Sequence, residues 1–165
     1  MNITEEKFKA TLLPSLRQDP LIDRALFSVI YSFNRFESVN VGFMIACQVG
    51  SLGLVTIMIG KGITIFDDGL WYACCGGQLK IVKYLTDKGA SDYDMGIYAA
   101  CRGGHKDIVQ FFIDNYYFRV DILDHALKIA CREGKKDMAL FLIQKGATNL
   151  NIFLTYFPDI ININT

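Results

Sequence analysis

Hydrophobic and small residues recur along this chain in four similar blocks between residues 40 and 150. In every block an alanine and a cysteine are followed, three residues after the cysteine, by a glycine. These glycines are Gly50, Gly77, Gly104 and Gly134, which are 27, 27 and 30 residues apart. An adjacent apolar pair follows each glycine, at Leu54 with Val55, Ile81 with Val82, Ile108 with Val109, and Met138 with Ala139. A fixed period of this length indicates a repeated structural unit.

Each block predicts two short helices joined at the glycine. The first helices are expected over residues 69–75, 96–102 and 126–132, and glycine ends them because it readily adopts the left-handed conformation. The second helices show apolar residues at positions i, i+1 and i+4, which form one face of a 3.6-residue period. A closing glycine stands twelve residues after the first one in three blocks, and Tyr116 takes its place in the other. Because one helix pair cannot bury its own apolar face, the pattern predicts an all-α solenoid of stacked pairs.

These residues resemble the ankyrin repeat, whose consensus has an Ala-Ala pair, a Gly-His turn, an Ile-Val pair and a closing Gly-Ala. The stretch AACRGGHKDIVQFFI, residues 99–113, carries Ala100, Gly104 with His105, and the apolar pair that follows. The resemblance covers four units, at about residues 41–66, 67–93, 94–123 and 124–151. In the family the turn histidine hydrogen-bonds between units. Here the other blocks hold Ser51, Gln78 and Lys135 at that position, so this bond is not expected in every unit.

The chain departs from the ankyrin pattern in two ways. The Thr-Pro-Leu-His opening is missing, and the units are 27 to 30 residues long where the family has about 33. The missing length falls between the repeats, as at residues 91–96, where the family forms a projecting β-hairpin, so these fingers should be short or absent. Short units of this kind resemble the ankyrin arrays of large DNA viruses and of some amoebal proteins.

The two ends of the chain do not follow the repeat. Residues 1–40 are predicted to form a helical N-terminal cap, with Asp19 and Pro20 at the start of its main helix. Residues 152–165 are interpreted as an incomplete fifth unit and an apolar tail. In this unit a first helix is expected over residues 152–157 and ends at Pro158.

Composition narrows the class of protein. Seventeen basic residues balance seventeen acidic ones, so the chain lacks the basic excess of a general nucleic-acid binder. No run of 18 uncharged apolar residues predicts a membrane span, and Glu5 and Glu6 are not typical of a secretory signal. Five cysteines, four of them at one repeat position, favour a reducing intracellular location, cytoplasmic or nuclear.

No catalytic, metal or cofactor site is expected. The recurrent cysteines Cys47, Cys74, Cys101 and Cys131 would lie about 8–10 Å apart in packed helices, too far for one zinc ion. We interpret these cysteines instead as small residues that pack between helices. Only two histidines are present, and the repeat accounts for nearly every serine, cysteine and histidine that a nucleophilic enzyme would use.

Candidate partner-binding residues lie on the first helices and in one insertion. In the ankyrin geometry Arg102 and Arg132 face outward on the concave side, as neighbours in adjacent units. The aromatic candidates on the first helices are Trp71, Tyr72 and Tyr98, and those in the insertion are Tyr116, Tyr117 and Phe118, which precede Arg119. Arginine, tyrosine and tryptophan are the residue types that most often anchor interfaces. For the aromatic residues, packing between units is the open alternative.

Two functions remain open from the sequence. The first is a protein–protein interaction module, an adaptor or targeting domain that uses the concave face. The second is a structural subunit of a larger protein or nucleoprotein assembly, docked through the apolar C-terminal tail. A solvated outer face of the second helices is expected to carry five lysines, namely Lys80, Lys83, Lys106, Lys135 and Lys136. Asp107 and Asp137 interrupt them, which argues against tracking of a phosphate backbone.

Overall fold

The computed structural model of the protein describes residues 39–116 and 119–158, and these ranges contain helices and turns without β-strands. The predicted all-α class is thus confirmed for the described part. The chain divides into two compact units, and the boundary between them lies between Ser91 and Asp92. Each unit is described by itself. The predicted N-terminal cap lies outside the described residues, except that Val39 and Asn40 belong to the first described helix.

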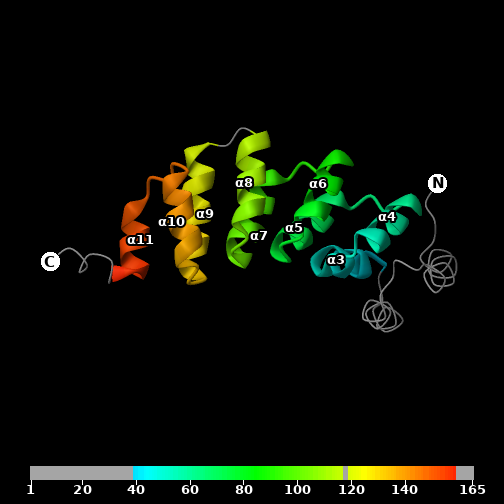
Figure 1. The fold of residues 1–165 in the computed structure, drawn as a ribbon, viewed down its shortest axis with the longest axis horizontal. Helices are drawn as coiled ribbons and strands as arrows, with labels where there is room; N and C mark the ends of the chain where they lie inside the picture. Colours follow the sequence, from blue (N-terminus) through cyan, green and yellow to red (C-terminus); the bar gives the residue numbers. More distant parts are fainter. Residues whose placement is uncertain (1–38, 117–118, 159–165) are drawn as a thin grey trace. The chain divides into compact units, whose positions relative to one another are not determined.

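The first unit holds two helix–turn–helix pairs. They are α3 (Val39–Val49) with α4 (Leu52–Gly60), and α5 (Phe66–Cys75) with α6 (Leu79–Asp87). The first helices α3 and α5 pack against each other, and so do the second helices α4 and α6, so the pairs stack in two layers (Figure 1).

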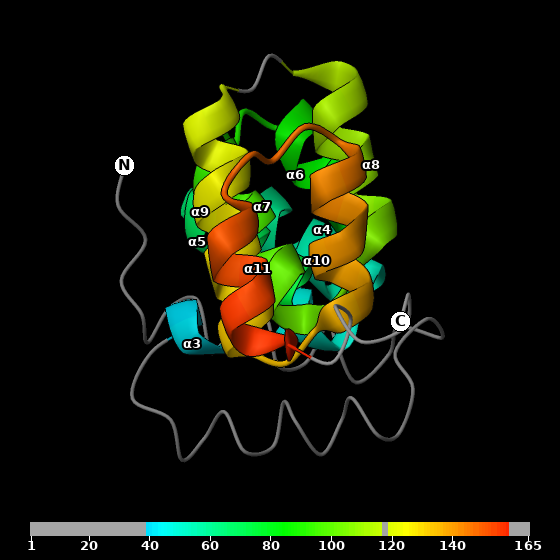
Figure 2. The same cartoon turned by 90° about the vertical axis from the view of Figure 1, so that its left-hand side faces the viewer.

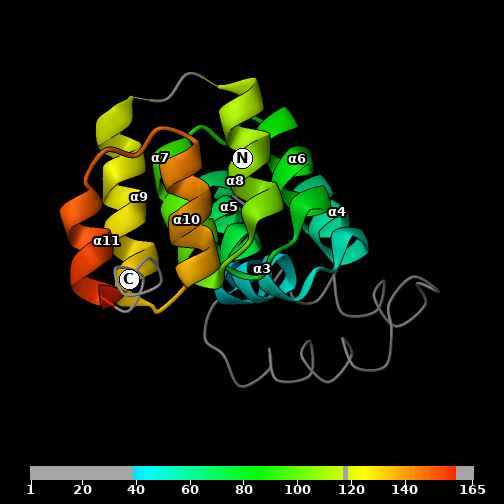
Figure 3. The same cartoon turned by 60° about the vertical axis from the view of Figure 1, so that its left-hand side comes forward.

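The second unit holds two further pairs and a single helix. They are α7 (Tyr93–Gly103) with α8 (Lys106–Asn115), α9 (Val120–Arg132) with α10 (Lys136–Gln144), and α11 (Leu150–Tyr156). Helix α9 lies between α7 and α11 in one layer, and α8 and α10 form the other (Figures 2 and 3). The helix predicted over residues 152–157 is therefore present, although it begins and ends slightly earlier.

The repeat glycines end the helices as the sequence predicts. Positive φ angles within the described residues occur only at glycine, at all four turn positions and all three closing positions. The residue after each turn glycine donates its backbone N–H to the carbonyl of the repeat alanine, at 2.8–3.0 Å, from Ser51, Gln78, His105 and Lys135. This is the hydrogen bond of a Schellman helix end, which needs the left-handed residue that glycine provides.

Gly76 permits a close approach of the backbones of two repeats in the first unit. A Cβ atom at this position would lie 2.0 Å from the carbonyl oxygen of Gln48, at the end of α3. Beside it, the side-chain amide of Gln78 donates to the carbonyls of Gly76, at 2.9 Å, and Gln48, at 3.3 Å. Gln78 occupies the turn-histidine position, so its amide makes an inter-repeat bond that the sequence did not predict there.

The first helices begin earlier than predicted, at Phe66, Tyr93 and Val120. In α7 the carboxylate of Asp92 caps the helix by accepting the N–H of Met95 at 3.3 Å. The inter-repeat residues therefore wind into the first helix, and only short turns join α4 to α5 and α10 to α11. Within the described part the projecting fingers of the ankyrin family are absent, as the short period predicts.

The core of each unit consists of the repeated small and apolar positions. Ala73, Ala100 and Ala130 are fully buried, as are the apolar pairs that follow each turn. No polar or charged side chain of the described residues is buried. Among these residues, none of the helices combines the length and the hydropathy that crossing a membrane requires.

Candidate functional site

The structure divides the predicted binding residues between the two units. Trp71 and Tyr72 lie half-buried on α5 of the first unit. Five others belong to the second unit, namely Tyr98, Arg102, Tyr116, Arg119 and Arg132. Tyr117 and Phe118 lie outside the described residues. The second unit therefore holds the larger part of the candidate site.

Arg102 and Arg132 occupy matching places on two packed helices. Arg102 lies in the last turn of α7 and Arg132 ends α9, where the helix dipole favours a positive charge. Both residues are exposed. The Nε atom of Arg102 lies 3.5 Å from Oε1 of Glu133, and these side chains are 61% and 41% exposed. Exposed pairs of this kind contribute little stability, so Arg102 can exchange Glu133 for another carboxylate at small cost.

Tyr98 lies one turn before Arg102 on the same face of α7. Its ring packs against that of His125 on α9, with centroids 4.6 Å apart and ring planes 33° apart. Burial raises the pKa of Tyr98, and the nearby carboxylates Asp94, Asp121 and Asp92 raise it further. The phenol is thus a neutral hydrogen-bond donor at pH 7. Tyr98 packs between repeats and remains half-exposed beside Arg102, so both roles left open by the sequence apply to it.

Tyr116 packs inside the second unit. Its ring stacks on Tyr93 of α7 with centroids 3.8 Å apart, and Phe112 lies 6.1 Å away. The backbone at Tyr116 is extended, with φ −134° and ψ 154°, whereas the glycine at this position of the other repeats is left-handed. Because tyrosine does not readily take the left-handed conformation, α8 ends without the usual closing turn. Tyr116 therefore packs against other aromatic rings of the fold, which is the alternative to partner binding that the sequence left open.

Arg119 forms a bidentate pair at the start of α9. Its Nε donates to Oδ1 of Asp121 at 2.9 Å, and the guanidinium also pairs with Oδ2. This hydrogen bonding from Arg119 lowers the pKa of the Asp121 carboxyl. Both side chains are more than half exposed, so the pair is a surface feature of the helix start.

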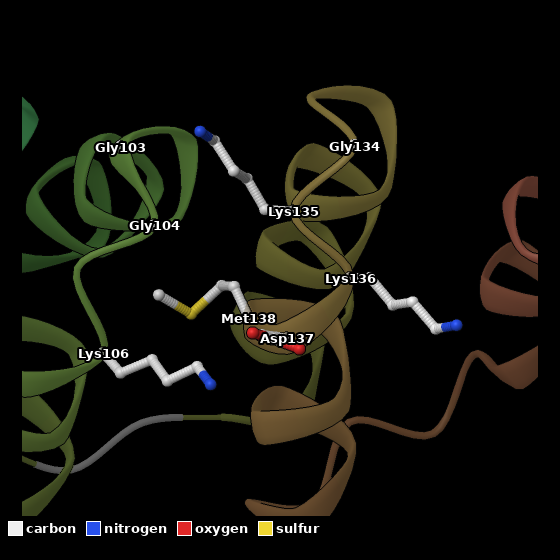
Figure 4. Close-up of a pocket in the computed structure, with 8 residues that line it drawn as sticks. All are labelled: Gly103, Gly104, Lys106, Gly134, Lys135, Lys136, Asp137 and Met138. Carbon is white, nitrogen blue, oxygen red and sulfur yellow. The ribbon is translucent and has the colours of Figure 1, made fainter.

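A shallow groove lies between the turns of the two helix pairs in the second unit. Its volume is about 590 Å³, and it is lined by Gly103, Gly104, Lys106, Gly134, Lys135, Lys136, Asp137 and Met138. Figure 4 shows the side chains of Lys106 and Lys135 reaching across the gap from opposite sides, while Lys136 points away. From the sequence, these lysines were expected only to lie on a solvated face of the second helices. The placement of Lys106 and Lys135 on one groove depends on the position of α8 beside α10, which the sequence alone did not specify.

Asp124 is a positioning residue that the sequence analysis missed. Its carboxylate accepts the N–H groups of Thr148 and Asn149 and the hydroxyl of Thr148, which ties α9 to the turn before α11. Burial alone would raise the pKa of Asp124, but these hydrogen bonds outweigh it and lower the pKa. Asp67 has the same repeat position in the first unit and accepts the N–H of Ser91 at 2.7 Å. The signal was an Asn or Asp at positions 40, 67, 94 and 124.

The four repeated cysteines are buried in the helix layers, as expected of small packing residues. Burial raises the pKa of the Cys47 and Cys101 thiols to about 12, and it also raises the pKa of Cys131. These thiols are therefore neutral at pH 7 and are poor nucleophiles and metal ligands. In the part of the chain that the structure describes, no three His, Cys, Asp or Glu side chains are grouped as metal ligands.

These raised pKa values predict a loss of stability at alkaline pH. Above about pH 8.5 an unfolded chain loses the protons of the Cys47 and Cys101 thiols while the folded chain keeps them up to about pH 12. The free energy of unfolding therefore falls by about 1.4 kcal/mol per pH unit for each of these two thiols. Urea denaturation at about pH 8 and about pH 10 measures this fall. We expect a smaller fall for Cys101→Ala than for the wild-type chain, and equal falls in both would contradict the role of this thiol.

Comparison with models of known protein families finds no match, and comparison with curated proteins finds no similar sequence. The resemblance to the ankyrin repeat thus rests on the repeated turn glycines, the apolar pairs and the closing Gly-Ala residues of the chain itself.

Proposed function

We propose that the chain is an ankyrin-type repeat protein that binds another protein and works without catalysis, as an intracellular adaptor or targeting module. The helix–turn–helix pairs and the left-handed glycine at each repeat turn support the ankyrin assignment. The first helices would then carry the recognition surface, in place of the missing fingers. The five cysteines, all of them free thiols, fit a reducing compartment, cytoplasmic or nuclear.

The observation that carries this proposal is the pair of exposed arginines at matching ends of α7 and α9. We name Tyr98, Arg102 and Arg132 the arginine face. It offers two guanidinium groups and a neutral phenol on adjacent packed helices. Guanidinium groups bind carboxylates in a bidentate manner and, with tyrosine, are enriched among residues that dominate binding energy. A partner with an acidic surface patch would complement this face.

The experiment that tests the proposal compares partner capture by the wild-type chain and by an Arg102→Glu, Arg132→Glu variant. Reversal of both charges should abolish capture through the arginine face while the folded structure is retained. Capture that is unchanged in this variant would contradict the proposed surface.

A second candidate function is a structural subunit of a larger protein or nucleoprotein assembly. It is favoured by α11, which buries Phe153 against the unit but leaves Leu150 and Leu154 48% and 38% exposed. These leucines are one helical turn apart on α11. In this candidate another subunit covers them, and the simplest one to test is a second copy of the chain.

The second candidate predicts self-association through α11. Light scattering would then give a mass above that of the monomer for the wild-type chain, and Leu150→Lys with Leu154→Lys would return it to the monomer mass because lysine cannot enter an apolar contact. The matched control is Asn151→Lys with Thr155→Lys, which adds the same charge at exposed polar positions of α11. A monomer in all three samples would count against self-association through this helix.

A further inference from the structure

The groove between the turns of the second unit is lined by lysine side chains, by the backbone of three glycines, and by Asp137 and Met138. Lys106 comes from the first turn of α8, and Lys135 from the turn before α10. The stem of Lys135 runs close to the Gly104 backbone, where an added Cβ would meet its Cδ at 3.6 Å. The lysine stem thus packs beside Gly104 at ordinary van der Waals distance and crosses the groove, with the ammonium group at the rim (Figure 4).

The charges of the groove are incompletely balanced. The ammonium groups of Lys106 and Lys135 face it together with one carboxylate, that of Asp137, whereas the ammonium group of Lys136 points away. None of these three lysines makes an ion pair within the described ranges 39–116 and 119–158. The ion pair of Arg102 with Glu133 involves no residue that lines the groove. Helices α8 and α10 also begin without a side-chain cap, so their first N–H groups add to the positive potential.

We propose that this groove binds an acidic peptide segment of a partner protein. The volume of about 590 Å³ is within the range of sites that enclose small ligands or a few peptide residues. Lys106 and Lys135 would pair with two carboxylates of the segment, and Asp137 would accept a backbone N–H from it. The buried Met138 supplies an apolar floor.

The carboxylate of Asp137 favours a peptide over a nucleic acid. A phosphate backbone carries only acceptors, and a carboxylate in its path is repulsive, whereas a peptide supplies N–H donors that Asp137 can accept. The inference rests on the proposed function in that it takes a protein as the partner, but it concerns other residues than the arginine face.

The test is fluorescence anisotropy of the full chain with a labelled octapeptide of alternating glutamate and serine, and with the same peptide carrying glutamine in place of glutamate. The decisive variant is Lys106→Gln with Lys135→Gln. Its control is Lys88→Gln with Lys145→Gln, which removes the same charge at exposed lysines that follow the C-terminal ends of α6 and α10. Circular dichroism verifies that each variant is folded.

We expect the glutamate peptide to bind the wild-type chain and the control equally, and about five- to tenfold more weakly to the groove variant. We also expect binding to weaken as salt is raised, because the groove pairs are partly exposed. No binding of the glutamate peptide, equal binding of the glutamine peptide, or equal weakening in both variants would overturn the proposal.

A labelled DNA duplex of similar length serves as the competing ligand. Tighter binding of the duplex than of the peptide, lost in the groove variant, would assign the groove to nucleic acid and overturn the proposal. The Arg102→Glu, Arg132→Glu variant separates this proposal from the arginine face. If this variant still binds the peptide and still captures the partner, the arginine face is rejected as the binding surface and the groove proposal stands. The two proposals can therefore fail separately.

Discussion

Replacement of Gly76 by alanine is expected to destabilise the first unit by about 3 kcal/mol or more. The added methyl group would lie 2.0 Å from the carbonyl oxygen of Gln48 and 2.9 Å from its carbon. Both are backbone atoms, so relief requires α5 to move away from α3 and would disturb the Gln78 hydrogen bonds beside the contact. The φ angle of Gly76 is −84°, an ordinary value, so the cost comes from the contact alone.

Two other glycines of the first unit provide matched controls. Gly89 has a φ of +104° and open space around its Cβ position, so Gly89→Ala should cost about 1–2 kcal/mol from backbone strain alone. Gly60 ends α4 without either feature, and Gly60→Ala should be neutral or stabilise by up to about 1 kcal/mol. Urea denaturation followed by circular dichroism gives the order. A Gly76→Ala midpoint at or above that of Gly89→Ala would contradict the close packing of α5 on α3.

Gly76 also illustrates what the sequence predicted about the fold. The turn glycines and closing glycines stand out by their period, and all of them adopt the left-handed backbone that ends a helix. The position before the turn glycine holds Val49, Gly76, Gly103 and Glu133, so the sequence gives no sign that a glycine is needed there. The need arises from the distance between neighbouring repeats, which periodicity does not report.

For the candidate site, the sequence predicted which side chains are exposed but did not predict their partners. Exposure of Arg102 and Arg132 follows from their place at the ends of the first helices, and the structure agrees. The ion pair from Arg102 to Glu133 joins two repeats, and the three hydrogen bonds on Asp124 join α9 to the turn before α11, far along the chain. The sequence places such residues on a helix face, but it does not choose their partners. For the same reason the lysine groove became visible only in the structure.

The second large expected effect concerns binding by the arginine face. In the Arg102→Glu, Arg132→Glu variant we expect partner affinity to fall at least about a hundredfold, because each guanidinium is replaced by a charge that repels an acidic partner. The fold should persist, because both side chains are exposed and the Arg102–Glu133 pair contributes at most about 1 kcal/mol.

A matched control isolates the effect of position from that of net charge. Lys88→Glu with Lys145→Glu reverses two exposed cations outside α7 and α9, so it changes the net charge of the chain by the same amount. These lysines also lie over Tyr84 and Phe141, at 5.5 and 5.4 Å from the ring centroids, so the control tests whether a modest loss of packing matters. Binding by this variant should remain within about threefold of the wild-type value.

Recognition through the arginine face is tested by the affinity of the captured partner for the wild-type chain, the arginine variant and the lysine control, compared at equal fold content by circular dichroism. We expect tight binding by the wild-type chain and the control, and loss of binding in the arginine variant alone. Equal affinity of all three, or equal loss in both variants, would contradict recognition through Arg102 and Arg132.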